Sequence, residues 1–300
     1  MNTKSTVQLL ALSFIWSAFF TCVQYVNRAL GVYVSAALMR VSALAFVLLS
    51  HILRRRLADL KAPAGSHLSL ILIGVMNFIL DGLAYIGFQY CPVSMGTALL
   101  KCDIIFVNLV TAIFYKKKIS LRDWLLTLFM LTGVFILIDV DFQSAKLNNA
   151  YCLLFVLSAF VVCCNAFLIQ SVQRRFADIK DMCIASYNLT FSGVCFALIA
   201  VIQAVFFAEP LRPITGNVPF VIILGGFVSM ALFEVYYKSL REFSVWLVKI
   251  FLLTMPVICA LMSYVLYGET LSPKQLWGIF IICIGAFFII LNEKQKAASA

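Results

Sequence analysis

Stretches of about 20 mostly apolar residues recur along the whole chain, separated by short polar segments. Each stretch is long enough to cross the roughly 30 Å hydrocarbon core of a bilayer as an α-helix. Because only helices and closed barrels satisfy their own backbone hydrogen bonds in hydrocarbon, the pattern predicts an all-α integral membrane protein with ten transmembrane helices. The expected spans are residues 7–26, 32–53, 68–89, 93–115, 121–138, 150–170, 183–207, 217–238, 244–267 and 274–291.

The composition leaves no room for a soluble domain. Of the 300 residues, 63% are hydrophobic and only 12% are charged, and the mean hydropathy is +1.02. Soluble domains usually contain about twice that charged fraction. No polar stretch is long enough to fold separately, so we expect residues 1–300 to form a single membrane domain. The ten cysteines show no metal-ligand spacing, which predicts no metal and no cofactor.

The net charge of +10 comes from basic residues clustered between the apolar stretches, a pattern that sets topology and does not favour nucleic-acid binding. Sixteen of the 23 lysines and arginines fall on one side of the expected membrane and four on the other. This bias predicts that both termini are cytoplasmic, in a bacterial inner membrane. The basic side carries Lys4, Arg54, Arg55, Arg56, Lys61, Lys116, Lys117, Lys118, Arg122, Arg174, Arg175, Lys180, Lys238, Arg241, Lys294 and Lys296.

The two halves of the chain repeat one another at a spacing of 152 residues. Repeat one covers about residues 7–138 and repeat two about residues 150–291. Because each repeat holds five spans, the two must cross the membrane in opposite directions, as in many secondary transporters. Ser120 with Asp123, and Ser272 with Gln275, have the spacing of helix N-caps with their partners. Three pairs recur at this spacing: Tyr115 and Tyr267, Ser120 and Ser272, and Gly133 and Gly285.

The chain resembles the drug/metabolite transporter superfamily, and specifically its EamA-type members with two five-helix repeats. The resemblance rests on Leu12–Phe20, on Met255–Val257 through Tyr267–Ser272, and on Gln275–Ile279 continuing to Gly285. It implies ten helices, cytoplasmic termini and transport of a small molecule. One departure is Lys117, which stands where the second repeat has the turn glutamate Glu269.

Polar residues form a stripe in the third span. Asn77, Asp81 and Tyr85 recur at every fourth position, which places them on one face of a helix. An ionised side chain near the bilayer centre is costly by about 2.5 kcal/mol or more and needs a partner or a wet cavity. The stripe therefore predicts either a substrate cavity or a ladder of hydrogen bonds between helices.

Further charges lie inside the second and fourth spans. Arg40 and Lys101 are each expected roughly 12 Å deep at about 1.5 Å per residue, and Lys101 shares a helix face with Asn108. Asp103 lies about 200° around the helix from Lys101, so at least one of the two must reach another helix. The alternatives are a substrate site and structural ion pairs, either Arg40–Asp81 or Arg40–Asp103.

The ninth span carries Lys249 and Pro256. Lys249 is expected either to extend toward the membrane surface or to mirror Lys101, with one lysine from each half approaching the midplane. Phosphate-carrying relatives in the superfamily use paired lysines, so the resemblance implies an anionic or zwitterionic substrate. Pro256 removes a backbone donor and predicts a kink in this helix.

We therefore predict a secondary transporter that moves an amino-acid-like zwitterion or an organic anion by alternating access. The alternatives are an exporter of cationic or aromatic drugs or amines, a non-transporting membrane protein and a membrane enzyme. The two histidines, His51 and His67, form no catalytic constellation, which predicts that the protein is not an enzyme. Expected partners are the bilayer and a small-molecule substrate, with coupling to protons or exchange, in a monomer or homodimer. The predicted substrate-binding residues are Arg40, Asn77, Asp81, Tyr85, Lys101, Asp103, Asn108 and Lys249.

Overall fold

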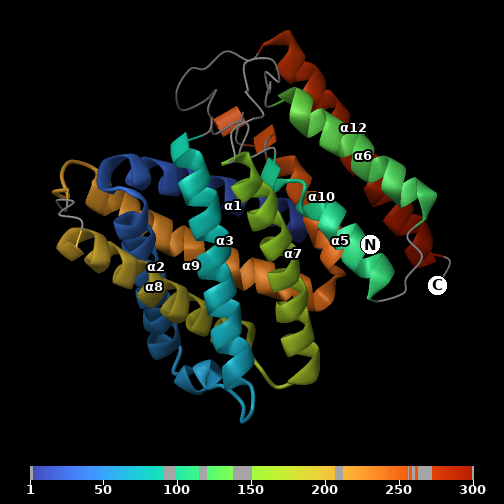
Figure 1. Cartoon of the computed structure of the whole chain (residues 1–300). Helices are drawn as coiled ribbons and strands as arrows, with labels where there is room; N and C mark the ends of the chain where they lie inside the picture. Colours follow the sequence, from blue (N-terminus) through green and yellow to red (C-terminus); the bar gives the residue numbers. More distant parts are fainter. Residues whose placement is uncertain are drawn as a thin grey trace. The chain divides into compact units, whose positions relative to one another are not determined.

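The computed structural model describes residues 3–90, 99–114, 120–137, 151–206, 212–255, 257–258, 261–262 and 272–298. Every regular element in these ranges is helical (Figure 1). The expected turns around residues 115–119 and 263–271, and the kink at Pro256, lie outside them. The elements are α1 (Thr3–Leu30), α2 (Val32–Leu53), the 3₁₀ helix η1 (Leu57–Leu60), α3 (His67–Tyr90), α5 (Asp103–Ile113), α6 (Leu121–Leu137), α7 (Cys152–Arg175), α8 (Asp181–Phe206), α9 (Val218–Glu242), α10 (Val245–Phe251), the 3₁₀ helix η2 (Leu252–Thr254) and α12 (Pro273–Ala298).

Within the described residues, seven helices are long and apolar enough to cross a membrane. They are α1, α2, α3, α7, α8, α9 and α12, and they correspond to seven of the ten expected spans. The expected spans 93–115, 121–138 and 244–267 appear as the shorter helices α5, α6 and α10. The helical class is confirmed, whereas the count of ten stays a prediction.

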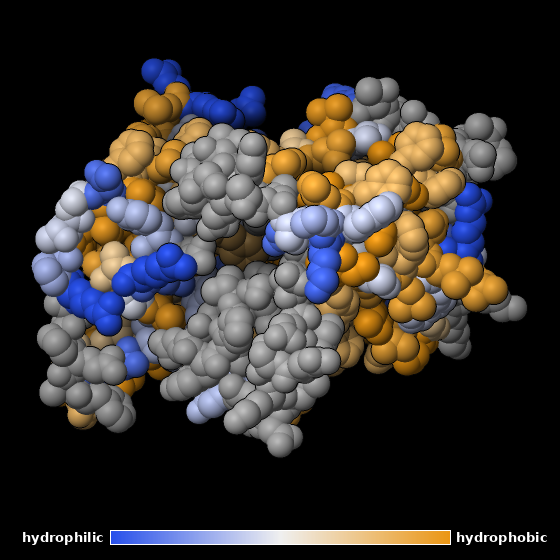
Figure 2. Space-filling model, turned by 90° about the horizontal axis from the view of Figure 1, so that it is seen from above, coloured by the Kyte–Doolittle hydropathy of each residue, from blue (hydrophilic) through white to orange (hydrophobic). Residues whose placement is uncertain are grey.

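The outer face of the helices is apolar. Large hydrophobic side chains are exposed along almost every helix, among them Val41, Leu68, Leu153 and Phe220. Figure 2 shows one such face, where hydrophobic residues cover broad areas and hydrophilic residues gather in small groups. A soluble monomer rarely exposes contiguous apolar patches larger than a few hundred Å², so this surface is suited to lipid.

The chain forms two compact units, and each combines residues from both halves of the sequence. The Arg40 unit consists of Ala18–Gly82 and Cys164–Glu242. The Lys249 unit consists of Met1–Ser17, Leu83–Cys163 and Phe243–Ala300. When 152 is added to the residue numbers of a unit's segments from the first half of the chain, most of the resulting positions fall in the same unit's segments from the second half. Each unit is therefore built from equivalent segments of the two repeats.

The predicted caps of the two matching helices are confirmed. At the start of α6, the Asp123 N–H donates to Ser120 Oγ over 3.1 Å. At the start of α12, the Gln275 N–H donates to Ser272 Oγ over 3.2 Å, and Gln275 Oε1 accepts from the Ser272 N–H at 2.8 Å. The second arrangement is a capping box, which satisfies two backbone donors that a helix start otherwise leaves open.

In the Lys249 unit, α6 and α12 pack side by side at two glycines (Figure 1). Gly133 of α6 faces Ile281 and Ile282, and Gly285 of α12 faces Phe129 and Met130. Adding 152 to the α6 residue numbers of one contact and subtracting 152 from its α12 residue numbers gives the other contact, so the two together have the self-complementary form of a two-fold axis. From one contact to the other, the residue numbers increase along α6 while they decrease along α12. The two equivalent helices are therefore antiparallel, as inverted repeats require.

The same relation holds in the Arg40 unit between α2 and α8. Arg40 lies beside Ser192 and Gly193, whereas Ala43 and Val47, further along α2, pack with Leu189, which comes earlier in α8. These helices are therefore antiparallel as well. Arg40 and Ser192 are 152 residues apart, so this contact also joins equivalent positions.

The glycine contact generates a test of the close packing between α6 and α12. A Cβ at Gly133 would lie 2.8 and 2.9 Å from side-chain carbons of Ile281 and Ile282. Since β-branched side chains are stiff, we expect Gly133→Ala to destabilise the protein by about 1–3 kcal/mol, the usual effect of overpacking. The measurement is the thermal unfolding midpoint in detergent.

Gly82→Ala is the matched control, because no atom lies within 4 Å of a Cβ at this helical glycine. It should leave the midpoint unchanged or raise it, as alanine favours helices over glycine by about 1 kcal/mol. Equal midpoints for the two variants would contradict the close packing at Gly133.

Candidate functional site

Arg40 anchors a buried polar network in the Arg40 unit. Its Nη2 atom forms an ion pair with Asp81 Oδ2 of α3, and its Nε atom donates to Ser192 Oγ of α8 over 2.8 Å. Asp81 also accepts a hydrogen bond of 3.0 Å from Asn77 Nδ2. The guanidinium carbon lies 4.4 Å from the ring centroid of Phe196. Of the two ion pairs expected for Arg40, the structure contains the pair with Asp81.

This network joins α2, α3 and α8 through one guanidinium group. The Arg40 side chain is 9% exposed and that of Asp81 is 25% exposed. The remaining Arg40 nitrogen donates to the Ala36 carbonyl over 3.2 Å. Each of the three guanidinium nitrogens therefore has an acceptor within the protein, and a role of Arg40 in substrate binding stays a prediction.

A second buried ion pair lies in the Lys249 unit. Lys249 Nζ of α10 is 3.0 Å from Asp103 Oδ2 of α5, and the two side chains are 2% and 10% exposed. Lys249 Nζ also lies 5.9 Å from the ring centroid of Trp16 in α1, within range of a cation–π interaction. The expectation that Lys249 extends to the membrane surface is wrong, because a buried carboxylate holds its ammonium group in the interior.

Two helix ends support this pair electrostatically. Lys249 lies in the last turn of α10, and Asp103 lies in the first turn of α5. A helix carries a partial positive charge at its first turn and a partial negative charge at its last turn. The Asp103 carboxylate and the Lys249 ammonium group therefore each lie where the helix dipole stabilises their charge. Asp103 therefore reaches another helix, as its position on the helix opposite to Lys101 predicted.

Both helices of this pair are interrupted, and they are interrupted at equivalent positions. Residues 99–100 are helical, Lys101 and Cys102 form a turn, and α5 begins at Asp103. In the second half, α10 ends at Phe251 and the 3₁₀ segment Leu252–Thr254 follows. The repeat spacing of 152 residues makes the position of Lys101 equivalent to the middle position of this 3₁₀ segment. In transporters built from repeats, interrupted helices in corresponding positions mark the substrate site.

The interruption in the second half has a covalent cause. Pro256 has no N–H, so the Leu252 carbonyl has no donor four residues later. The Met255 N–H donates to this carbonyl instead, which tightens the chain into a 3₁₀ turn. Two serines of α1 satisfy further acceptors nearby: Ser13 Oγ donates to the Phe251 carbonyl over 3.1 Å and Ser17 Oγ to the Met255 carbonyl over 3.3 Å.

Three other predicted residues belong to the Lys249 unit. Lys101 Nζ lies 3.3 Å from Met255 Sδ, next to the interruption in the second half. Asn108 of α5 is fully buried, and neither of its amide atoms has a hydrogen-bond partner within the described part of the chain. Tyr85 is buried as well. Asn77 and Asp81 belong to the Arg40 unit, so the stripe on α3 is divided between the two units.

The structure also identifies site residues that the sequence prediction missed. Ser192 accepts a hydrogen bond from Arg40. The signal in the sequence that could have identified Ser192 is the repeat spacing, because the two residues are 152 positions apart. Ser13 and Ser17 lie one helical turn apart on α1, a spacing that predicts a shared face. Asn188 Nδ2 donates to Tyr237 Oη over 2.5 Å in the Arg40 unit. No group of acidic, histidine or cysteine side chains suited to a metal occurs among the described residues.

Comparison with known proteins places this architecture in a family. The sequence profile of the EamA-like transporter family matches residues 4–139 and again residues 149–291. The chain therefore belongs to the EamA-like transporter family, and it is a multi-pass membrane transporter with two EamA repeats. The predicted family is confirmed. The family and the named relatives are transporters.

Relatives at low identity cover nearly the whole chain. The chain is 22% identical over 302 residues to an S-adenosylmethionine/S-adenosylhomocysteine transporter of Chlamydia muridarum, covering 95% of this chain and 91% of that protein. It is 24% identical over 299 residues to the transporter of the same name from Chlamydia trachomatis serovar L2, covering 95% and 88%. A crystal structure with 16% sequence identity has a TM-score of 0.78 and covers 98% of this chain and 99% of that chain, a likeness of fold.

The ion pair between Lys249 and Asp103 generates a second prediction. Removing one partner of a buried pair leaves an uncompensated charge and costs about 3–5 kcal/mol, whereas replacing both by apolar residues is often neutral. We expect Lys249→Met and Asp103→Leu each to lower the thermal unfolding midpoint strongly, and the double variant to recover most of the loss. Additive losses in this double-mutant cycle would show that the two side chains do not interact.

Proposed function

We propose that the protein is a secondary transporter that carries a zwitterionic, amino-acid-bearing metabolite across a bacterial inner membrane by alternating access. The observation that carries the proposal is the buried Lys249–Asp103 pair at two interrupted helices. A transporter needs charges that can bind a polar substrate inside the membrane, and these two are buried, opposite in sign and supported by helix ends.

A zwitterion is the substrate that matches such a pair. A ligand carboxylate would take Lys249 as its partner, and a ligand ammonium group would take Asp103, so one internal ion pair would be replaced by two. A substrate with a single charge would satisfy one of these residues and leave the other buried without a partner, which is costly. The charge pattern therefore favours an amino acid group over a simple anion or a simple cation.

The relatives suggest which amino-acid-bearing metabolites to test. Proteins of similar length with 22–24% identity are named S-adenosylmethionine/S-adenosylhomocysteine transporters. S-Adenosylmethionine combines an amino acid group with a sulfonium cation and an adenine ring. Trp16 beside Lys249 offers an aromatic face for a cation or a purine, and the buried Asn108 amide supplies both a donor and an acceptor. These features fit a substrate of this class.

The proposed mechanism rests on the repeats. Antiparallel packing of α6 with α12 and of α2 with α8 supports two inverted five-helix repeats, with ten spans and cytoplasmic termini in a single membrane domain. Such repeats rock against each other to expose the site alternately to the two sides. Coupling would come from exchange or from proton uptake, in a monomer or homodimer. The second candidate, an exporter of cationic or aromatic compounds, is favoured only by the aromatic ring of Trp16.

Uptake into proteoliposomes tests the proposal. Protein reconstituted without other components should accumulate radiolabelled S-adenosylmethionine in a saturable manner, and unlabelled S-adenosylhomocysteine inside the vesicles should stimulate uptake. Because Lys249→Met also lowers stability, it is assayed below its unfolding midpoint at an equal amount of folded protein, where it should lower the initial rate about ten- to hundredfold, as expected for the loss of a hydrogen bond to a charged group. The matched control is Lys238→Gln, which removes a charge from a half-exposed side chain and should leave the rate unchanged.

Competition by unlabelled compounds then separates the alternatives. Inhibition by molecules with a free amino acid group, but not by adenosine or by aromatic cations, would support a zwitterion site. Inhibition by aromatic cations alone would favour the exporter of drugs or amines. Full activity of Lys249→Met would rule out Lys249 as a substrate-binding residue.

A further inference from the structure

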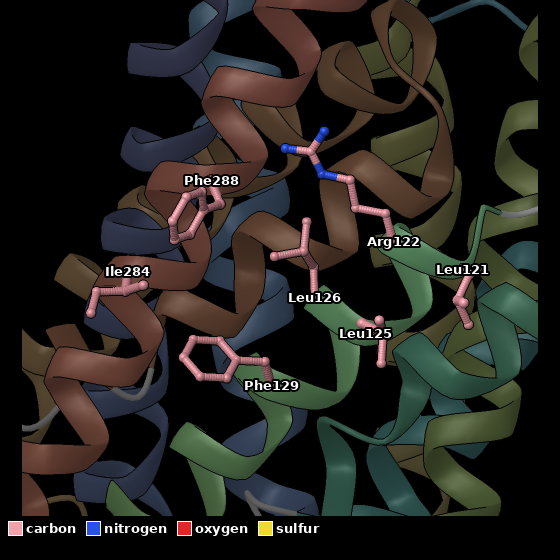
Figure 3. A pocket seen from close by; sticks show the side chains of 7 residues that line it. All are labelled: Leu121, Arg122, Leu125, Leu126, Phe129, Ile284 and Phe288. Carbon is pink, nitrogen blue, oxygen red and sulfur yellow. The ribbon is translucent and has the colours of Figure 1, made fainter.

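A groove between α6 and α12 in the Lys249 unit has a volume of about 630 Å³. Figure 3 shows Arg122 extending from the start of α6 toward α12 at one end, and Phe129 and Ile284 further along. The lining is apolar except for Arg122, and most of its side chains are exposed. The lining residues are Leu121, Arg122, Leu125, Leu126, Phe129, Ile284 and Phe288.

The glycine contact explains why the groove is there. At Gly133 and Gly285 the two helices are held close together, because neither position carries a side chain. Toward the start of α6 the helices instead present leucine and phenylalanine side chains, and the groove lies among them. An apolar groove that opens on an apolar surface suits an acyl chain.

The positive charge of Arg122 at the end of the groove indicates a ligand with an anionic head group. Arg122 lies in the first turn of α6, four positions after the last of the three consecutive lysines 116–118, on the side that the bias of basic residues predicts to be cytoplasmic. An arginine at a membrane interface binds phosphate oxygens with two parallel hydrogen bonds. The cytoplasmic leaflet also carries the anionic lipids that basic clusters attract.

We propose that this groove binds an anionic glycerophospholipid, with the phosphate on Arg122 and an acyl chain along Leu125, Phe129 and Phe288. The site is separate from the Lys249–Asp103 pair and does not depend on which metabolite the protein carries. A lipid held here contacts both α6 and α12, the matching final helices of the two repeats.

The repeat supplies a matched control at the opposite end of the same helix pair. A shift of 152 residues carries Arg122 onto Lys274, which is also exposed. There Leu125 and Leu126 become Trp277 and Gly278, so the lining differs although the charge is the same. Lys274 also lies on the opposite side of the expected membrane. Lys274→Gln therefore removes one basic residue without touching the groove.

Native mass spectrometry of the delipidated 300-residue protein tests the site. Phosphatidylglycerol and phosphatidylethanolamine with identical acyl chains are added, and the bound lipid is counted. We expect phosphatidylglycerol to bind more tightly, and Arg122→Gln to weaken it about fivefold, the factor for one basic residue at a lipid surface. Lys274→Gln should have no effect. Leu125→Trp, which fills the groove, should weaken both lipids.

The results separate a specific site from general attraction. Equal binding of the two lipids, or equal losses in Arg122→Gln and Lys274→Gln, would overturn the proposal. A lipid-free dimer that Leu125→Trp abolishes would show that a second copy covers the groove, and would overturn the proposal as well. Unfolding midpoints identify any variant that is misfolded, and because Arg122 is exposed, its replacement should leave the fold intact.

Discussion

The need to pair every backbone N–H and C=O without water determines where this chain can depart from a regular helix. A departure inside hydrocarbon requires another donor or acceptor close by. At the interruption after α10, the Met255 N–H and the hydroxyl groups of Ser13 and Ser17 fill that role. The interruption therefore depends on α1 as much as on Pro256, and the helices around Lys249 form a single hydrogen-bonded arrangement.

The same constraint applies to charge. Arg40 and Lys249 are both buried, and each is paired with an aspartate on another helix. The two pairs differ in what surrounds them. Arg40 uses its three nitrogens on protein acceptors, whereas Lys249 and Asp103 lie at helix ends next to an interrupted backbone. A firmly held pair suits a fixed framework, and a pair at interrupted helices suits a site that changes partners.

The sequence was sufficient to predict the helical class, the family, the caps of α6 and α12 and the charged residues of the two networks. These features depend on local patterns: apolar length, the spacing of Ser272 and Gln275, and rare charges within spans. It was not sufficient to choose between Asp81 and Asp103 as the partner of Arg40, because that choice depends on which helices become neighbours. The kink predicted from Pro256 gave no sign that the chain would tighten into a 3₁₀ turn at Leu252–Thr254, because that outcome depends on which donor replaces the missing N–H.

The contact between Arg40 and Ser192 bears on how the two halves of the gene diverged. Equivalent positions that meet across a two-fold axis face a copy of themselves whenever the two halves are identical. An arginine at both positions would bring two buried guanidinium groups together, and each would need its own carboxylate. The position equivalent to Asp81 is Phe233 in this chain, so the contact as it stands can neutralise only one arginine. A single chain that holds both halves allows this asymmetry, because position 40 can carry arginine while position 192 carries serine.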